Sequence, residues 1–81
     1  GTVAAADAEA RLSVDERDQL NRAAALAETR YRAGLASFLE VLEARRAADA
    51  SGERAAAALG RAARAGAVLW QALGGEPAPA T

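Results

Sequence analysis

The chain has 81 residues with ten basic and eleven acidic side chains, so it forms at most one small domain and lacks the basic excess that a nucleic-acid partner requires. It contains no cysteine and no histidine, which excludes a disulfide framework, a thiolate metal site and the usual general base of an enzyme. No apolar run approaches the roughly 20 residues of a membrane-spanning helix, and no N-terminal signal peptide is visible.

Alanine dominates the apolar residues. Hydrophobic residues make up 52% of the chain, but 26 of them are alanine, and the larger ones are nine Leu, four Val and one each of Phe, Tyr and Trp. Alanine is the best helix former and buries little area per residue. The composition therefore predicts an all-α protein whose helices need close neighbours, as in long coiled coils or helical barrels.

The first predicted helix covers residues 3–32. Asp18/Arg22 and Glu28/Arg32 stand four residues apart with the acid first, the favourable order for a helical pair. A broad apolar stripe is expected to contain Leu12, Leu20, Ala23, Ala27 and Tyr31. Ser13-Val14-Asp15-Glu16 matches a capping box and could mark a break, but no glycine or proline stands just before it to stop the first helix. We therefore expect one continuous helix.

A tight turn is predicted at residues 33–37. Gly34 can adopt the positive φ that ends a helix, and Ser37 can cap the next one. Glu40 stands three residues after Ser37, so the pair matches a capping box. Residues 1–75 are thus expected to form an antiparallel two-helix hairpin with its tip at 33–37.

The second predicted helix covers residues 37–73. An apolar face begins directly after the turn with Phe38, Val41 and Leu42. Gly52, Gly60 and Gly66 interrupt the helix, either as tolerated defects or as sites of close helix approach, and the sequence does not decide between them. Trp70 is interpreted as a packing anchor for the helix end. Gly74 and Gly75 stop the helix, and residues 76–81 are predicted to be a disordered tail.

Two motifs in the chain resemble the second periplasmic hairpin of TolC-like outer-membrane efflux proteins. That hairpin has a Tyr-x-x-Gly turn followed by a Val/Leu-Leu-Asp-Ala-Gln-Arg run, and an Ala-Leu-Gly-Gly ending roughly thirty residues later. The matching segments here are Tyr31-Arg32-Ala33-Gly34-Leu35, Phe38-Leu39-Glu40-Val41-Leu42-Glu43-Ala44-Arg45-Arg46 and Ala72-Leu73-Gly74-Gly75. The resemblance covers about residues 23–75, less than a fifth of a full family member.

The resemblance implies a segment of a larger assembly in the outer membrane and periplasm. Members of the family form trimers whose long helices make a periplasmic tunnel, through which small molecules are exported passively without bond chemistry. The hairpin tips meet a periplasmic adaptor that links the channel to an inner-membrane transporter. By this resemblance Gly34 and Leu35 would be the adaptor-contact residues, and the segment would be part of a homotrimer that it does not itself anchor in the membrane.

The resemblance also assigns roles to three further residues. Acidic residues at the family's tip face the lumen, so Glu40 and Glu43 are candidates for the tunnel constriction, where threefold symmetry makes each carboxylate a ring that attracts cations. The alternative is a helix-capping acid and a solvated acid in the first helical turn. Tyr31 would hydrogen-bond between helices near the tip, or serve as a half-buried aromatic anchor. Arg45 stands where Gln is frequent, and Ala36 is too short for a salt bridge at the tip.

Other functions remain open from the sequence. A standalone helical hairpin could bind another coiled coil through its Ala/Leu stripe. Arg11-Leu12-Ser13 resembles the short tip motif of some periplasmic adaptors, but it lies away from the predicted turn. An enzyme is the least favoured reading, because Asp15, Glu16 and Asp18 have no converging base, and we expect no catalytic, cofactor or metal residues.

Overall fold

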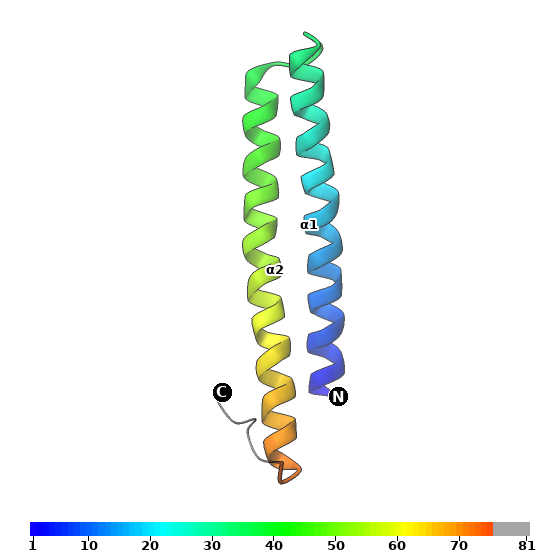
Figure 1. Cartoon of the computed structure of the whole chain (residues 1–81), viewed down its shortest axis with the longest axis vertical. Helices are drawn as coiled ribbons and strands as arrows, with labels where there is room; N and C mark the ends of the chain where they lie inside the picture. The colour runs from blue at the N-terminus through cyan, green and yellow to red at the C-terminus, as the bar shows by residue number, and fades with distance from the viewer. Residues whose placement is uncertain (76–81) are drawn as a thin grey trace, which may run out of the picture.

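The computed structural model describes residues 1–75 and consists of two antiparallel helices (Figure 1). Helix α1 spans Thr2–Arg32 and helix α2 spans Phe38–Ala72, where residues 3–32 and 37–73 were expected. The described part contains no strand, which confirms the predicted all-α helical hairpin. Helix α1 is continuous through Ser13 and Glu16, so the second capping-box pattern does not break it. The predicted tail at 76–81 lies outside the described residues.

The end of α1 is set by a glycine in the left-handed region. Gly34 has a φ of 78°, and its N–H donates to the carbonyl of Tyr31 at 3.0 Å. The N–H of Leu35 donates to the carbonyl of Arg30 at 2.8 Å. This pair of bonds is the Schellman motif, which satisfies carbonyls that the helix end would otherwise leave free.

The end of α2 repeats the same arrangement. Gly74 has a φ of 83° and donates to the carbonyl of Gln71 at 3.0 Å, while Gly75 donates to the carbonyl of Trp70 at 3.1 Å. A Cβ on Gly75 would lie 2.5 Å from the indole of Trp70, so only glycine allows this ring to fold over the helix end. Trp70 thus packs against the Schellman turn, although about half of its surface remains exposed.

The helices pack along one seam in which residues recur at alternating steps of three and four, the spacing of a coiled coil. Every seam residue is buried or half-buried, and ten of the sixteen are alanine. The α1 side consists of Val3, Ala6, Ala10, Ser13, Arg17, Leu20, Ala24 and Ala27; the α2 side consists of Val41, Ala44, Ala48, Ser51, Ala55, Ala58, Ala62 and Ala65. We call these residues the seam. Small side chains at the contact allow two helices to approach closely.

The predicted apolar stripe on α1 is wrong in part. Leu20 and Ala27 lie in the seam, but Leu12 is 71% exposed and Ala23 also faces solvent. The reason is that alanines occupy almost every face of α1, so several stripes have a similar apolar character. The helices meet along the face with the smallest residues, and the larger Leu12 remains outside.

Three ion pairs join the helices beside the seam, each with the acid on α1 and the arginine on α2. They are Glu9–Arg61, Glu16–Arg54 and Glu28–Arg45. The step of seven from Glu9 to Glu16 matches the step of seven back from Arg61 to Arg54, as an antiparallel register requires. We call this set the ion-pair ladder.

The pairs predicted within α1 are only partly formed. Glu28 lies 3.7 Å from Arg32, as expected for residues four apart, and it also reaches Arg45 on α2. Asp18 pairs with its neighbour Arg17 at 3.1 Å in place of Arg22. Because Arg17 lies in the seam, its pair with Asp18 compensates the half-buried guanidinium.

Candidate functional site

The hairpin tip presents one apolar side chain on a closed turn. Leu35 follows Gly34 and is 69% exposed. Arg30 binds both polar groups of the Leu35 backbone. The Arg30 carbonyl accepts from the Leu35 N–H at 2.8 Å, and the Arg30 guanidinium Nη2 donates to the Leu35 carbonyl at 3.2 Å. The backbone at Leu35 is therefore held on both sides, and its side chain is the part available to a partner.

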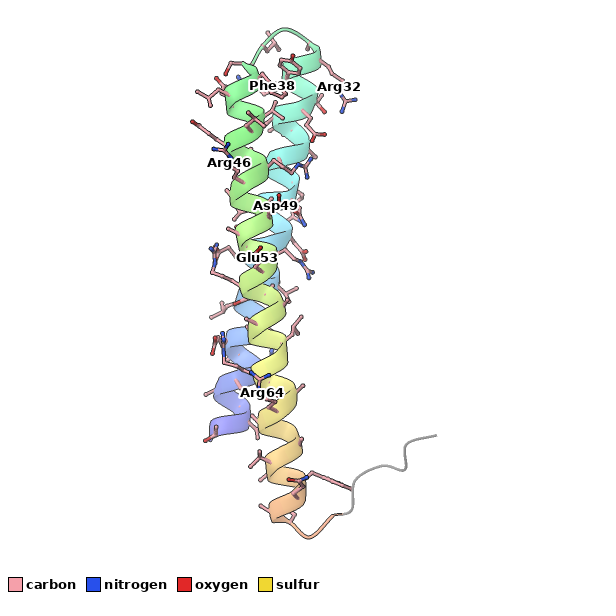
Figure 2. The ribbon with its side chains drawn as sticks, turned by 90° about the vertical axis from the view of Figure 1, so that its left-hand side faces the viewer. Arg32, Phe38, Arg46, Asp49, Glu53 and Arg64 are labelled. Carbon is pink, nitrogen blue, oxygen red and sulfur yellow. The ribbon has the colours of Figure 1, made fainter. Side chains whose placement is uncertain are left out.

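Two aromatic rings lie beside this turn. Tyr31 in the last turn of α1 and Phe38 at the start of α2 have ring centroids 5.6 Å apart, with planes inclined at 52°. This tilted geometry is favourable for aromatic pairs. Figure 2 shows Phe38 at the tip end of the hairpin. Phe38 and Leu39 each expose more than half of their surface, and Tyr31 and Leu35 are exposed as well. We call these four exposed residues at the tip end of the hairpin the tip cluster.

The acidic candidates lie next to the tip cluster on α2. The N–H of Glu40 donates to Ser37 Oγ at 3.1 Å, so Ser37 caps the helix as predicted. Glu40 and Glu43 are both exposed, and neither carboxylate forms an ion pair among residues 1–75. Both residues are thus open to solvent in the first turns of α2, where residues three apart lie near each other on the helix surface.

The pairing of Tyr31 with Phe38 and the ion-pair ladder were not predicted. Tyr31 stands three residues before Gly34, and Phe38 stands three residues after Leu35, so their symmetry about the turn is a usable signal. Two rungs of the ladder, Glu9–Arg61 and Glu16–Arg54, are signalled by acids and arginines that recur at a step of seven on opposite helices. The third rung, Glu28–Arg45, does not follow this step. The Arg11-Leu12-Ser13 motif lies in the first half of α1, far along the chain from the turn.

The acids considered for an enzyme are engaged elsewhere or lie in the open. Glu16 pairs with Arg54, and Asp18 pairs with Arg17. Asp15 borders an open groove of about 320 Å³ together with Asp7, Ala10, Arg11, Val14, Leu59 and Ala62. No set of three carboxylates within residues 1–75 is arranged to hold a metal ion. Neither α1 nor α2 contains an apolar stretch of the length that a membrane-spanning helix needs.

The chain matches no protein family, no curated protein and no solved structure. The functional argument therefore rests on the residues and geometry of the hairpin and on the motifs described above.

Proposed function

We propose that this hairpin is a segment of a trimeric outer-membrane efflux or secretion channel of the TolC-like kind. In this proposal it forms part of the periplasmic tunnel through which small molecules pass, and its tip contacts a periplasmic adaptor that is linked to an inner-membrane transporter. The observation that carries the proposal is the tip itself, where Leu35 is displayed on a closed glycine turn beside the Tyr31–Phe38 pair.

The tip has the physical character of a protein contact. Exposed apolar side chains that are grouped on a small surface mark interaction sites more often than scattered ones do. The turn beneath Leu35 is closed by two backbone bonds and by the Arg30 guanidinium, so binding would require little ordering of the loop. Gly34 and Leu35 are the residues that we assign to the adaptor contact, and Tyr31 supports them by packing on Phe38.

The outer surface of the hairpin supports an assembly with neighbouring helices. The buried core of residues 1–75 consists of five alanines and Ser51, while large apolar side chains face outward along both helices. Leu12 and Leu26, two heptads apart on α1, expose 71% and 60% of their surfaces. A helix pair that buries its smallest residues and exposes its leucines is suited to further helices on its outer faces.

The adaptor contact is tested by cross-linking. Residues 3–73 replace the corresponding hairpin in a TolC-like channel, and Leu35→Cys is introduced with a matching cysteine at the adaptor tip. We expect a disulfide in the assembled system. Leu12→Cys is the matched control, since Leu12 is as exposed as Leu35 but lies on the helix shaft. If residues 33–37, scanned one at a time, give no more cross-link than Leu12→Cys, the adaptor contact is refuted.

The constriction assignment is tested separately by conductance. In the same chimeric channel, Glu40→Gln and Glu43→Gln are expected to weaken the preference for cations, because each substitution removes one ring of three carboxylates. Glu53→Gln is the control, because Glu53 lies on the outward face of α2 and forms no ion pair in the described chain (Figure 2). Unchanged selectivity in the first two variants removes both residues from the constriction.

A standalone helical-hairpin interaction module is the second candidate. The observation that favours it is that the hairpin has its own end signals: Ser37 caps α2, and Gly34 and Gly74 close both helix C-termini. Such a module would use the same exposed leucines to bind another coiled coil. The two candidates differ in whether the isolated chain is stable, which is the last prediction below.

A further inference from the structure

An apolar groove lies midway along one side of the hairpin, away from the ends of both helices. It is the groove of about 320 Å³ between α1 and α2 whose lining includes Val14 and Leu59. These two residues lie at the same level, because Val14 stands two heptads before Glu28 and Leu59 stands two heptads after Arg45, the α2 partner of Glu28. Leu59 is 47% exposed and Val14 is half-buried, so together they present an apolar patch on this side of the hairpin.

The α2 residues on this side are arranged almost symmetrically about Leu59. Ala56 stands three residues before it and Ala63 four residues after it, while Gly52 and Gly66 stand seven residues away on either side. A Cβ at either glycine would meet no atom within 4 Å among residues 1–75, so the surface is open there. If a second α2 crosses this face in the antiparallel direction, the two copies of Leu59 meet, and alanines and glycines on both sides of them allow the helices to approach closely.

The charges on the α1 side of the groove have opposite signs on either side of Val14. Arg11 stands three residues before Val14, and Asp15 directly follows it. Both line the groove, and neither forms an ion pair among residues 1–75. When two α1 helices lie antiparallel with Val14 on Val14, Arg11 of each copy lies beside Asp15 of the other. Asp7, the remaining charge in the groove, lies opposite the uncharged Asn21.

We propose that this face binds a second copy of the chain, in an antiparallel two-fold pair with Val14 and Leu59 of both copies at its centre. Helix α1 then packs on α1 and α2 on α2, and the two hairpin tips lie at opposite ends of the pair. The occupant is a second copy because the face is complementary to itself, in side-chain size along α2 and in charge along α1. The face leaves the tip free, so the proposal is independent of the channel function.

The test is sedimentation equilibrium of the full chain at low salt over a concentration series. We expect a monomer–dimer equilibrium, in which Leu59→Glu raises the dissociation constant about tenfold or more by placing two carboxylates at the centre of the pair. Leu12→Glu is the matched control, because Leu12 is exposed at a similar level of α1 but does not line the groove. A chain that stays monomeric, or one that forms trimers, overturns the proposal. Equal weakening by Leu12→Glu and Leu59→Glu overturns it as well.

A mixing experiment tests the antiparallel arrangement itself. Arg11→Asp and Asp15→Arg each place like charges together when identical chains pair, so either variant alone is expected to associate about threefold to tenfold more weakly. An equimolar mixture of the two variants is expected to recover the original association, because a pair of unlike chains has opposite charges at both contacts. A variant that had merely lost its fold could not be rescued in this way. If the mixture associates no better than the separate variants, the antiparallel pair is refuted.

Discussion

The carboxylate of Glu16 on α1 lies 2.8 Å from the guanidinium of Arg54 on α2. The Glu9–Arg61 pair lies seven residues away on each helix, and Glu28–Arg45 lies nearer the tip. Because all three acids are on α1 and all three arginines on α2, a shift of one helix along the other would separate every pair. An alanine seam has few bulky residues to define the register, so the ladder gives the hairpin a second determinant of its alignment.

Reversing one rung is expected to weaken the hairpin modestly. Glu16→Arg places two arginines together and should lower the free energy of unfolding by about 0.5–1 kcal/mol, since both partners are roughly half exposed and solvent screens the charges. Adding Arg54→Glu should restore most of the loss. The measurement is urea unfolding followed by far-UV circular dichroism at low salt. Glu53→Arg, on the outward face of α2, serves as the control.

The charge swap distinguishes a direct Glu16–Arg54 interaction from a general effect of surface charge on stability. Rescue by the second substitution requires that Glu16 and Arg54 interact directly. Glu16→Arg and Glu53→Arg could lower the free energy of unfolding equally, with no recovery when Arg54→Glu is added to Glu16→Arg. In that case the ladder does not contribute to the register.

Gly52 and Gly66 within α2 have room for a side chain. A Cβ at either position would meet nothing within 4 Å among residues 1–75, so these residues are not packing sites within the hairpin. Gly52→Ala and Gly66→Ala should each raise the free energy of unfolding by up to about 1 kcal/mol, because alanine restricts the unfolded chain and favours the helix. Thermal helix loss measures the change. A loss of stability in either variant would show that the methyl group is not accommodated.

At the tip, replacing Gly34 by alanine is expected to have the opposite effect on stability. Its φ of 78° lies in a region that disfavours a side chain, although a Cβ there would meet no atom within 4 Å. Gly34→Ala is therefore expected to lower the free energy of unfolding by about 1 kcal/mol through backbone strain alone. Gly34→Asn should cost less, since asparagine tolerates this conformation better. Equal losses for the two variants would contradict the strain argument.

Signals within a few residues were sufficient to predict much of the fold. Gly34 and Ser37 determine a helix stop and a helix start, and two long helices joined by so short a turn must lie side by side. The exposure of Leu35 follows from the same turn. The seam could not be predicted, because alanine surrounds both helices and makes their faces alike. The Tyr31–Phe38 contact and the ladder depend on the register across two helices, which no local pattern on one helix defines.

Ser51 is the one buried residue of the seam that is not alanine. It is 1% exposed, and its hydroxyl has no hydrogen-bond partner among residues 1–75. Ser51→Ala should raise the free energy of unfolding by about 1 kcal/mol, because a buried hydroxyl without a partner is costly and alanine is the better helix former. Ser13→Ala is the control for helix preference, since Ser13 is only half-buried. Urea unfolding of the two variants measures the difference.

A larger residue at the same position should have the opposite effect. Ser51→Leu adds volume between two closely packed backbones and is expected to lower the free energy of unfolding by about 1–3 kcal/mol. If Ser51→Leu is as stable as the original chain, the seam is not tightly packed at this level. If Ser51→Ala raises the free energy of unfolding no more than Ser13→Ala does, the buried Ser51 hydroxyl does not destabilise the hairpin.

The isolated chain is expected to be only partly helical at low concentration. Within the described part of the chain the buried residues are five alanines and one serine, and alanine contributes little burial to offset the entropy of ordering two long helices. Far-UV circular dichroism and light-scattering mass, measured over a concentration series, test this expectation. Helicity that rises with concentration means that the exposed leucines need neighbours, as the channel proposal requires. A monomer of fixed mass with a cooperative melt means that the hairpin is sufficient by itself, because its caps, seam and ladder then hold it without a partner. That result would favour the standalone interaction module over the channel segment.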